Sequence, residues 1–237
     1  MSKMRIGTMV TLAVLGLGSM VWAQDAPPGF GFLDDEVQLR ANPNTAVSLT
    51  WLAPDAYSRL AQYNAIIVEQ PEIALHPEST HKSIKPDAVK LLADDFMNAV
   101  AGAIETSYPV VTAPGDGVLH FRWAIGNLKL KKKWSKNPLK YTPVGAAAGA
   151  VKKSMTDDLT QKVAVHEMTI ELELLDSQTG ERLFAAREWR EKEKDPTSWE
   201  ELDQLMHSWG KTLACRMDNA RVPQDKRKNC LKLAPAS

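Results

Sequence analysis

The stretch that decides the fold is KVAVHEMTIELELLDSQTGERLFAAREWREK, residues 162–192. Apolar and polar side chains alternate on both sides of its centre, and a period of two is typical of β-strands with one buried face. Between the two halves, DSQTG contains Asp176, whose carboxylate can accept hydrogen bonds within its own turn, and Gly180, which tolerates a positive φ. The segment therefore predicts a β-hairpin.

This hairpin is dense in charge, and the alternation places its acidic side chains on the polar face. Glu167, Glu171 and Glu173 share that face, and charge on one side of a half-buried strand is usually solvated. We therefore expect these carboxylates to point into solvent, with Arg190 across from Glu167 on the neighbouring strand. A catalytic carboxylate would instead need an apolar cleft, so the pattern indicates a scaffold.

Outward from the hairpin, four further segments have clear patterns. YNAIIVEQ, 63–70, is a β-branched run that predicts a strand, and GVLHFRWAIGNL, 117–128, alternates as a second strand. A helix is expected from about Pro86 to Thr106, because proline suits a first helical position and apolar residues follow at three- and four-residue steps. The last helix is expected to begin at Ser198, which fits a capping box with Glu201. Its expected buried stripe consists of Leu202, Leu205, Met206, Trp209 and Leu213.

The order of these elements is strand, helix, strand, insertion, strand, strand, helix. We expect one α+β domain over residues 24–237, with a mixed or antiparallel sheet of about four strands and both amphipathic helices on one face. Residues 24–50 are rich in proline, glycine and asparagine and are predicted to be loop. Trp123, Trp189 and Trp209 lie on apolar faces and are expected in the core.

Residues 1–23 have the pattern of a signal peptide. Lys3 and Arg5 form a positive start, residues 8–20 are apolar, and Ala23 is a small residue at the expected cleavage site. The apolar run is shorter than the roughly 20 residues that a membrane-spanning helix needs. We therefore expect export and a periplasmic location, and an association with the outer membrane stays open.

Export decides how the two cysteines are interpreted. Cys215 and Cys230 are the only cysteines in the chain, and an isolated pair in an oxidising compartment usually forms a disulfide. Their spacing does not match the C-x-x-C motif of redox proteins. We expect a bond that fastens the C-terminal tail to the last helix.

Residues 129–160 interrupt the strand pattern and are interpreted as a lysine-rich insertion. Its first part, KLKKKWSKNPLKYTPVGAAAGAVKK at 129–153, holds eight lysines and no acidic residue, with Trp134 and Tyr141 among them. Single-sign blocks of this kind are usually solvated loops. The other interpretation is a patch for an anionic partner, such as lipid headgroups in peripheral membrane contact, a polysaccharide or single-stranded nucleic acid.

The overall charge gives no support to nucleic-acid binding. The chain has 29 basic and 29 acidic residues, so no global attraction to a polyanion follows. A nucleic-acid role would have to rest on the insertion, for example on Lys131 and Lys132, and no specific nucleic acid is expected as a partner.

No motif in the chain identifies a reaction, a cofactor or a metal. His166 and Glu167 begin like a zinc-protease motif, but Ile170 stands where the second histidine is needed. The chain has no nucleophile elbow, phosphate loop or dinucleotide fingerprint. His76 and His81 flank Glu78 in an expected loop, which is a weak metal-ligand pattern. We therefore assign no catalytic, cofactor-binding or metal residue.

Two hypotheses for function follow. The first is a non-catalytic cell-envelope protein that binds a partner protein or an envelope polymer through its sheet or through the insertion. The second is a periplasmic hydrolase or metal-dependent enzyme that uses His76, His81 or His120. The second hypothesis requires these side chains to converge in a cleft with acidic residues.

Several segments together resemble an uncharacterised family of Gram-negative envelope lipoproteins, domain of unknown function 3313. The resemblance implies an exported domain of strands flanked by helices, with no known reaction and no catalytic residue to carry over. Family members commonly have a lipid-attachment cysteine at the cleavage site, whereas Gln24 follows Ala23 here, which favours a form without a lipid anchor. The segments are GFL at 31–33, YSRL at 57–60, YNAIIVEQPEIAL at 63–75, APGDGVLHFRWAI at 113–125 and IELELLDSQTGERLFAA at 170–186.

Overall fold

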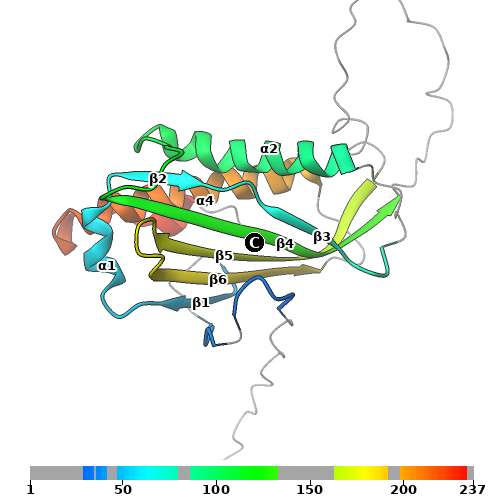
Figure 1. Ribbon diagram of the computed structural model, residues 1–237, viewed down its shortest axis with the longest axis horizontal. Coiled ribbons are helices and arrows are strands. Elements are labelled where there is room, and N and C mark those ends of the chain that lie inside the picture. The colour runs from blue at the N-terminus through cyan, green and yellow to red at the C-terminus, as the bar shows by residue number, and fades with distance from the viewer. Residues whose placement is uncertain are drawn as a thin grey trace, which may run out of the picture.

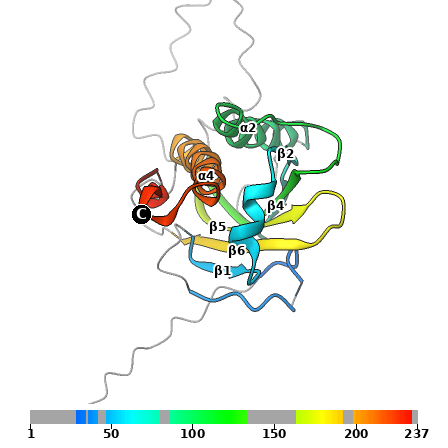
Figure 2. The same cartoon turned by 90° about the vertical axis from the view of Figure 1, so that its left-hand side faces the viewer.

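The protein is an α+β domain in which one mixed sheet carries two long helices on the same face (Figures 1 and 2). This agrees with the fold class expected from the sequence. The sheet has six strands within the described residues, so the expected number of about four is wrong. The computed structural model describes residues 29–34, 36–41, 47–79, 86–132, 163–191 and 198–233.

The predicted hairpin is confirmed as strands β5 (Val163–Asp176) and β6 (Arg182–Glu191), which pair in antiparallel fashion. The carboxylate of Asp176 accepts hydrogen bonds from the backbone N–H groups of Gln178 at 3.0 Å and Thr179 at 2.8 Å. These donors lower the pKa of Asp176 below its ordinary value. Gly180 has a φ of 72°, so the turn is built as the sequence indicates.

Strand β4 (Val118–Lys132) lies on the other side of β5 and is longer than expected. It pairs with β5 as far as Lys132, so residues 129–132 belong to the sheet and not to a lysine-rich insertion. The rest of that expected insertion, 133–160, lies outside the described residues, as does the expected signal peptide at 1–23. The pairing shifts register between Gly126 and Lys129, which interrupts the alternation at this point.

Two short strands account for the difference in strand number. Strand β1 (Leu49–Leu52) pairs antiparallel with β6, at the end of the region expected to be loop. Strand β3 (Glu72–Leu75) pairs parallel with β4, next to the predicted strand β2 (Ala65–Val68). Four residues are too few to show a period of two clearly, and Pro71 separates β3 from β2.

Helices α2 (Pro86–Glu105) and α4 (Trp199–Ala220) lie side by side over the sheet, as Figure 2 shows. The predicted capping box of α4 is present: the Glu201 N–H donates to Ser198 Oγ at 3.1 Å, and the Ser198 N–H donates to the Glu201 carboxylate at 2.7 Å. A short helix, α1 (Ala56–Arg59), and a 3₁₀ turn follow β1 and lead into β2.

The core fills the space between the helices and the sheet. Trp123 and Trp209 are buried there, as expected, and the rings of Phe96 and Trp199 stack with centroids 6.3 Å apart. Trp189 is 38% exposed, so its expected place in the core is wrong. It pairs with Thr169 on the face of the sheet that points away from the helices.

The expected disulfide is present between Cys215 in α4 and Cys230 in a terminal 3₁₀ turn. It fastens the tail to the last helix, and Asn219 exchanges two hydrogen bonds with the backbone of Lys228 beside it, both 2.8 Å long. Within the described ranges, no helix has the length and apolar character needed to cross a bilayer.

The two long helices approach closely at Gly210. A Cβ atom at this position would lie 2.5 Å from the carbonyl oxygen of Val100 and 2.7 Å from the Cβ of Ala103. We expect Gly210→Ala to lower the free energy of unfolding by about 1–3 kcal/mol, because the α2 backbone would have to move away. Urea denaturation followed by circular dichroism measures the change.

Gly102 in α2 provides the matched control for this prediction. A Cβ there would meet nothing within 4 Å, so Gly102→Ala is expected to raise the free energy of unfolding by up to about 1 kcal/mol through helix propensity. Equal shifts of the same sign in both variants would contradict the close approach at Gly210.

Candidate functional site

Residues 29–34 and 36–41, which we call the N-terminal strap, lie on the face of the sheet that points away from the helices (Figures 1 and 2). The backbone N–H groups of Phe32 and Leu33 both donate to the Glu171 carboxylate at 3.1 Å. Glu171 is 0% exposed and Glu173 is 4% exposed. The expectation that these carboxylates point into solvent is therefore wrong, because the strap takes the place of water on this face.

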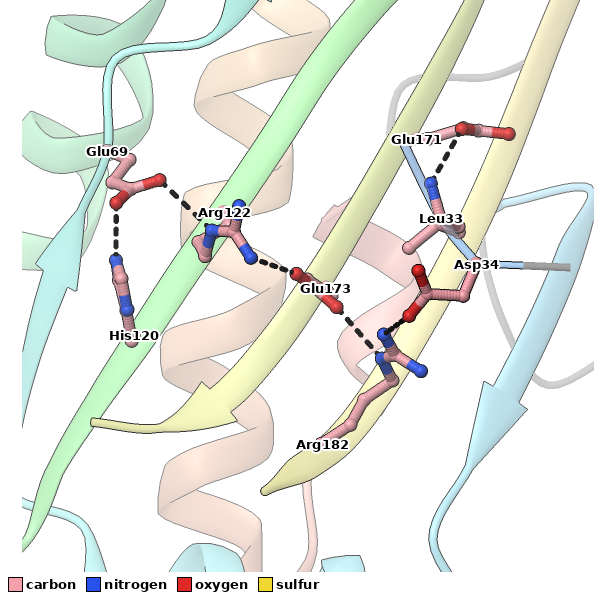
Figure 3. A network of polar contacts seen from close by, with 8 residues as sticks. All are labelled: Leu33, Asp34, Glu69, His120, Arg122, Glu171, Glu173 and Arg182. Atoms are coloured by element: carbon pink, nitrogen blue, oxygen red, sulfur yellow. Dashed lines mark hydrogen bonds and ion pairs between the residues drawn. The ribbon is translucent and has the colours of Figure 1, made fainter. Parts of the chain in front are cut away.

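Each buried carboxylate is paired with arginine. Arg187 donates to Glu171 at 2.7 Å. Glu173 accepts from Arg122 at 2.7 Å and from Arg182 at 2.8 Å, and Figure 3 shows it between the two guanidinium groups. A network whose members are satisfied in this way rigidifies a structure, so we assign it to holding the strap on the sheet.

The network continues to the strap and to the edge of the sheet. Arg182 also pairs with Asp34 of the strap at 3.1 Å. Arg122 also approaches the Glu69 carboxylate, which lies 2.9 Å from Nε2 of His120 (Figure 3). The chain of contacts therefore runs from His120 on β4 to the strap.

The expected pairing of Arg190 with Glu167 is wrong by one residue. Glu167 lies across from Glu191, and Arg190 lies across from Met168, with its Nε 3.4 Å from Glu188. The β5–β6 pairing shifts register between Leu174 and Leu175. Counting back from the turn without this bulge gives the expected pair, so an extra residue in the bulge explains the difference.

The histidines proposed for an enzyme do not converge where they are described. The His76 N–H donates to the carbonyl of Leu128, whereas His120 is near the start of β4. Along β4, Leu128 and His120 are eight residues apart, which corresponds to roughly 26 Å. His81 lies outside the described residues.

The loop around His76 is occupied with other contacts. Its Nδ1 accepts a hydrogen bond from the Glu78 N–H at 3.0 Å, and the Glu78 carboxylate pairs with Lys129 at 3.0 Å. The Lys129 ammonium group lowers the pKa of Glu78. Among the described residues, no group of three or more histidine, cysteine or acidic side chains is placed to hold a metal ion.

A hollow lies under helix α4, on the side of β1, and we call it the α4 pocket. Its volume is about 350 Å³, within the range of roughly 300–1,000 Å³ that is usual for small-molecule sites. Most of its wall is apolar. The lining residues from the sheet include Leu52, Phe121, Leu172, Leu174 and Phe184.

Three polar side chains of α4 face this pocket. Trp209, Thr212 and Arg216 are spaced by three and four residues, so they lie along one face of the helix. Nε1 of Trp209 and Oγ1 of Thr212 are buried, and neither forms a hydrogen bond with any described residue. Arg216 is the one charged residue in the described lining.

Helix α1 forms part of the pocket wall, and the C-terminal tail contacts α1 beside it. Tyr57 of α1 is part of the lining, and the guanidinium of Arg227 lies 4.5 Å from the centre of its ring, a cation–π contact. Burial lowers the pKa of Arg216, and the nearby Tyr57 partly offsets this. Leu52 is 50% exposed, so the pocket opens to solvent beside β1.

Sequence patterns did not reveal the α4 pocket, because its walls come from segments between Val47 and Arg216. One local signal was available. Arg216 follows Trp209 by seven residues, and Thr212 lies between them, so two polar residues interrupt the buried stripe of α4.

The fold and the pocket define an α+β domain with a cavity of ligand size, and sequence comparison places it in a family. The family model described as "Protein of unknown function (DUF3313)" matches residues 30–213. The match covers most of the chain, so the chain belongs to this family, as the resemblance indicated. No curated protein matches the chain in sequence.

Two solved structures with distant similarity are PelC dodecamers from Paraburkholderia phytofirmans. One, a variant, is 14% identical and covers 65% of this chain and 92% of that chain, with a TM-score of 0.32. The other is 13% identical and covers 71% of this chain and 94% of that chain, also with a TM-score of 0.32. Similarity at this level supports no statement about function.

Proposed function

We propose that this chain is a non-catalytic, exported protein of the cell envelope that acts by binding, and that the α4 pocket is its binding site. The observation that carries the proposal is a cavity of about 350 Å³ with mostly apolar walls. Ligand sites typically combine such walls with a few placed polar groups, and Trp209, Thr212 and Arg216 supply them here.

A periplasmic location is part of the proposal. The Cys215–Cys230 disulfide supports it, because disulfides persist in oxidising compartments. The signal-peptide pattern of residues 1–23 points to the same compartment.

The pocket favours a small ligand over the partner protein or envelope polymer that was expected from the sequence. Helices α2 and α4 cover one face of the sheet, and the N-terminal strap covers part of the other (Figure 2), so a bare sheet face is not the binding surface that we propose. A mostly apolar cavity suits a small apolar ligand better than a polar chain. The hydrolase alternative gains no support from His76 and His120, which lie far apart.

A blocked pocket tests the proposal. Leu213 lines the α4 pocket and is only partly buried, so Leu213→Trp would fill the cavity without opening the core. The probe is the neutral fluorophore N-phenyl-1-naphthylamine, which brightens in apolar surroundings. We expect saturable binding to the wild type and an affinity at least tenfold lower, about 1.4 kcal/mol, in Leu213→Trp.

Leu75→Trp is the control, because Leu75 lies on β3, is 36% exposed and is not part of the pocket lining. This variant should bind the probe like the wild type. The proposal fails if the wild type does not bind, or if Leu213→Trp binds as tightly as Leu75→Trp.

A further inference from the structure

The disulfide closes a loop that touches the wall of the α4 pocket at two points. The loop consists of residues 216–229, and we call it the disulfide loop. Its first residue, Arg216, belongs to the pocket lining. Near its other end, the guanidinium of Arg227 lies 4.5 Å from the centre of the Tyr57 ring, which also lines the pocket. Part of the pocket wall is therefore in contact with a segment that the disulfide holds.

The Tyr57 part of this wall belongs to α1, which is only four residues long. A helix this short gains little stability from its own hydrogen bonds, so its position depends on its neighbours. One neighbour is the hairpin turn, where the Glu181 carboxylate accepts two hydrogen bonds from Arg59, 2.6 and 2.8 Å long. The other is Arg227 of the disulfide loop, whose cation–π contact with Tyr57 is of a kind that shifts an equilibrium about two- to fivefold at an exposed site.

Two features of the disulfide loop place Arg227 on this ring. Cys230 follows it by three residues and is bonded to α4, and Asn219 of α4 holds the backbone of Lys228 through two hydrogen bonds, both 2.8 Å long. Of these two links, only the disulfide is covalent. Opening a ring that joins residues 15 apart returns conformational freedom to the chain between them. We therefore expect Arg227 to spend less time on Tyr57 once the bond is reduced.

We propose that the Cys215–Cys230 disulfide controls the affinity of the α4 pocket, so that the oxidised protein binds its apolar ligand more tightly than the reduced protein does. In the oxidised protein, the disulfide loop keeps Arg227 on Tyr57 and that part of the wall is already ordered. In the reduced protein, the wall must be ordered when the ligand binds, and this ordering costs affinity. The inference rests on the proposed function and adds the regulation of the same site.

A second hollow brings solvent to the disulfide without passing through the ligand site. Its volume is about 300 Å³, and Cys215, Lys211 and Lys228 are among its lining residues. The residues of α4 that line it are about half a helical turn away from those that line the α4 pocket, so the two hollows lie on opposite sides of the helix. The positive charge of the two lysines favours an approaching thiolate.

The reductant that the proposal requires is a dithiol. Its thiolate attacks Sγ of Cys215, which forms a mixed disulfide and releases Cys230 as a thiolate. The second thiol of the reductant then displaces Cys215 from the mixed disulfide. Two electrons and two protons pass to the two cysteines, and the dithiol becomes a disulfide.

Binding in the two redox states tests the coupling. N-phenyl-1-naphthylamine is titrated into the oxidised wild type and into the wild type reduced by excess dithiothreitol, at a temperature at which circular dichroism shows both to be folded. We expect Kd to rise about threefold on reduction, the size of one cation–π contact. Equal affinities in the two states would overturn the inference and leave the proposed function standing, whereas no binding by the oxidised protein would contradict both.

Arg227→Gln tests the same coupling in the oxidised protein, so the result does not depend on the stability of the reduced chain. We expect about threefold weaker binding of the probe and little further change on reduction, because the contact with Tyr57 is already lost. Lys226→Gln is the control, since Lys226 is the neighbouring residue and is exposed in the same loop. It should bind like the wild type and keep the response to reduction. If Arg227→Gln binds as tightly as Lys226→Gln, the disulfide loop does not support the pocket and the inference is wrong.

The redox equilibrium provides a second readout that does not depend on an affinity measurement. A bond that tightens ligand binding is itself stabilised by the ligand, and by the same factor. We expect saturating N-phenyl-1-naphthylamine to shift the thiol–disulfide equilibrium of the wild type about threefold towards the disulfide, as measured by alkylation of free thiols and mass spectrometry. An equilibrium that the bound probe leaves unchanged would contradict the coupling.

Discussion

Arg187→Leu is expected to lower the free energy of unfolding by about 3–5 kcal/mol, because it leaves the Glu171 carboxylate buried without its ion-pair partner. Glu171 is 0% exposed and accepts the Arg187 guanidinium at 2.7 Å. Two strap N–H groups remain as donors to Glu171, but they carry no full positive charge. Guanidinium chloride denaturation of the variant and the wild type measures the difference.

The control for this prediction is an ion pair of similar length on the surface. Lys90 and Asp94 are 2.8 Å apart on α2, and both are in contact with solvent. Removing such a pair with Lys90→Ala is expected to change the free energy of unfolding by less than about 1 kcal/mol. Similar losses in Lys90→Ala and Arg187→Leu would show that burial under the strap does not set the strength of the Glu171 pair.

Removal of the disulfide is expected to have the second large effect. The bond links residues 15 apart in sequence, and closing a loop of that length stabilises a protein by about 3 kcal/mol in the chain-entropy model. The double variant Cys215→Ala with Cys230→Ala should therefore melt about 6–12 °C lower than the wild type, at about 2–4 °C for each kcal/mol in a chain of this size. Differential scanning calorimetry measures the midpoint.

The redox state of the wild type provides the control. Full reduction of the wild type should lower its melting midpoint by a similar amount, while the double alanine variant should not respond to the reductant. A melting midpoint that is the same in the oxidised wild type and the double variant would contradict a stabilising role for the Cys215–Cys230 bond.

The parts of the fold that depend on local sequence could be predicted. The turn at 176–180 carries its own hydrogen-bond acceptor and its own glycine, and α4 carries its own capping box. The disulfide followed from the expected compartment and from the presence of only two cysteines. The turn and the capping box depend only on residues that are close in sequence, and the disulfide depends on a residue type that occurs only twice in the chain.

The burial of Glu171 and Glu173 could not be predicted in this way. Alternation shows which residues share a face of a strand, but it does not show whether water or another segment covers that face. The covering residues belong to the strap, which is about 140 residues earlier in the chain. The strap belongs to residues 24–50, whose proline, glycine and asparagine content predicted only a loop.

The α4 pocket lay out of reach for a similar reason. Its walls come from β1, α1, β4, β5, β6 and α4, and no short segment of sequence shows how such elements are spaced once they pack together. The sequence contains only the interruption of the buried stripe by Thr212 and Arg216. On a helix with one solvated face, polar residues such as these more often mark the border of the buried stripe than a ligand-binding site.

The most direct test of the central claim, that the α4 pocket binds a small apolar ligand, is a crystal structure with 1-bromonaphthalene. Anomalous scattering locates the bromine without reference to the protein side chains. We expect one strong peak inside the cavity, beside Leu172 and Trp209. A bromine peak found only outside the cavity would contradict the account.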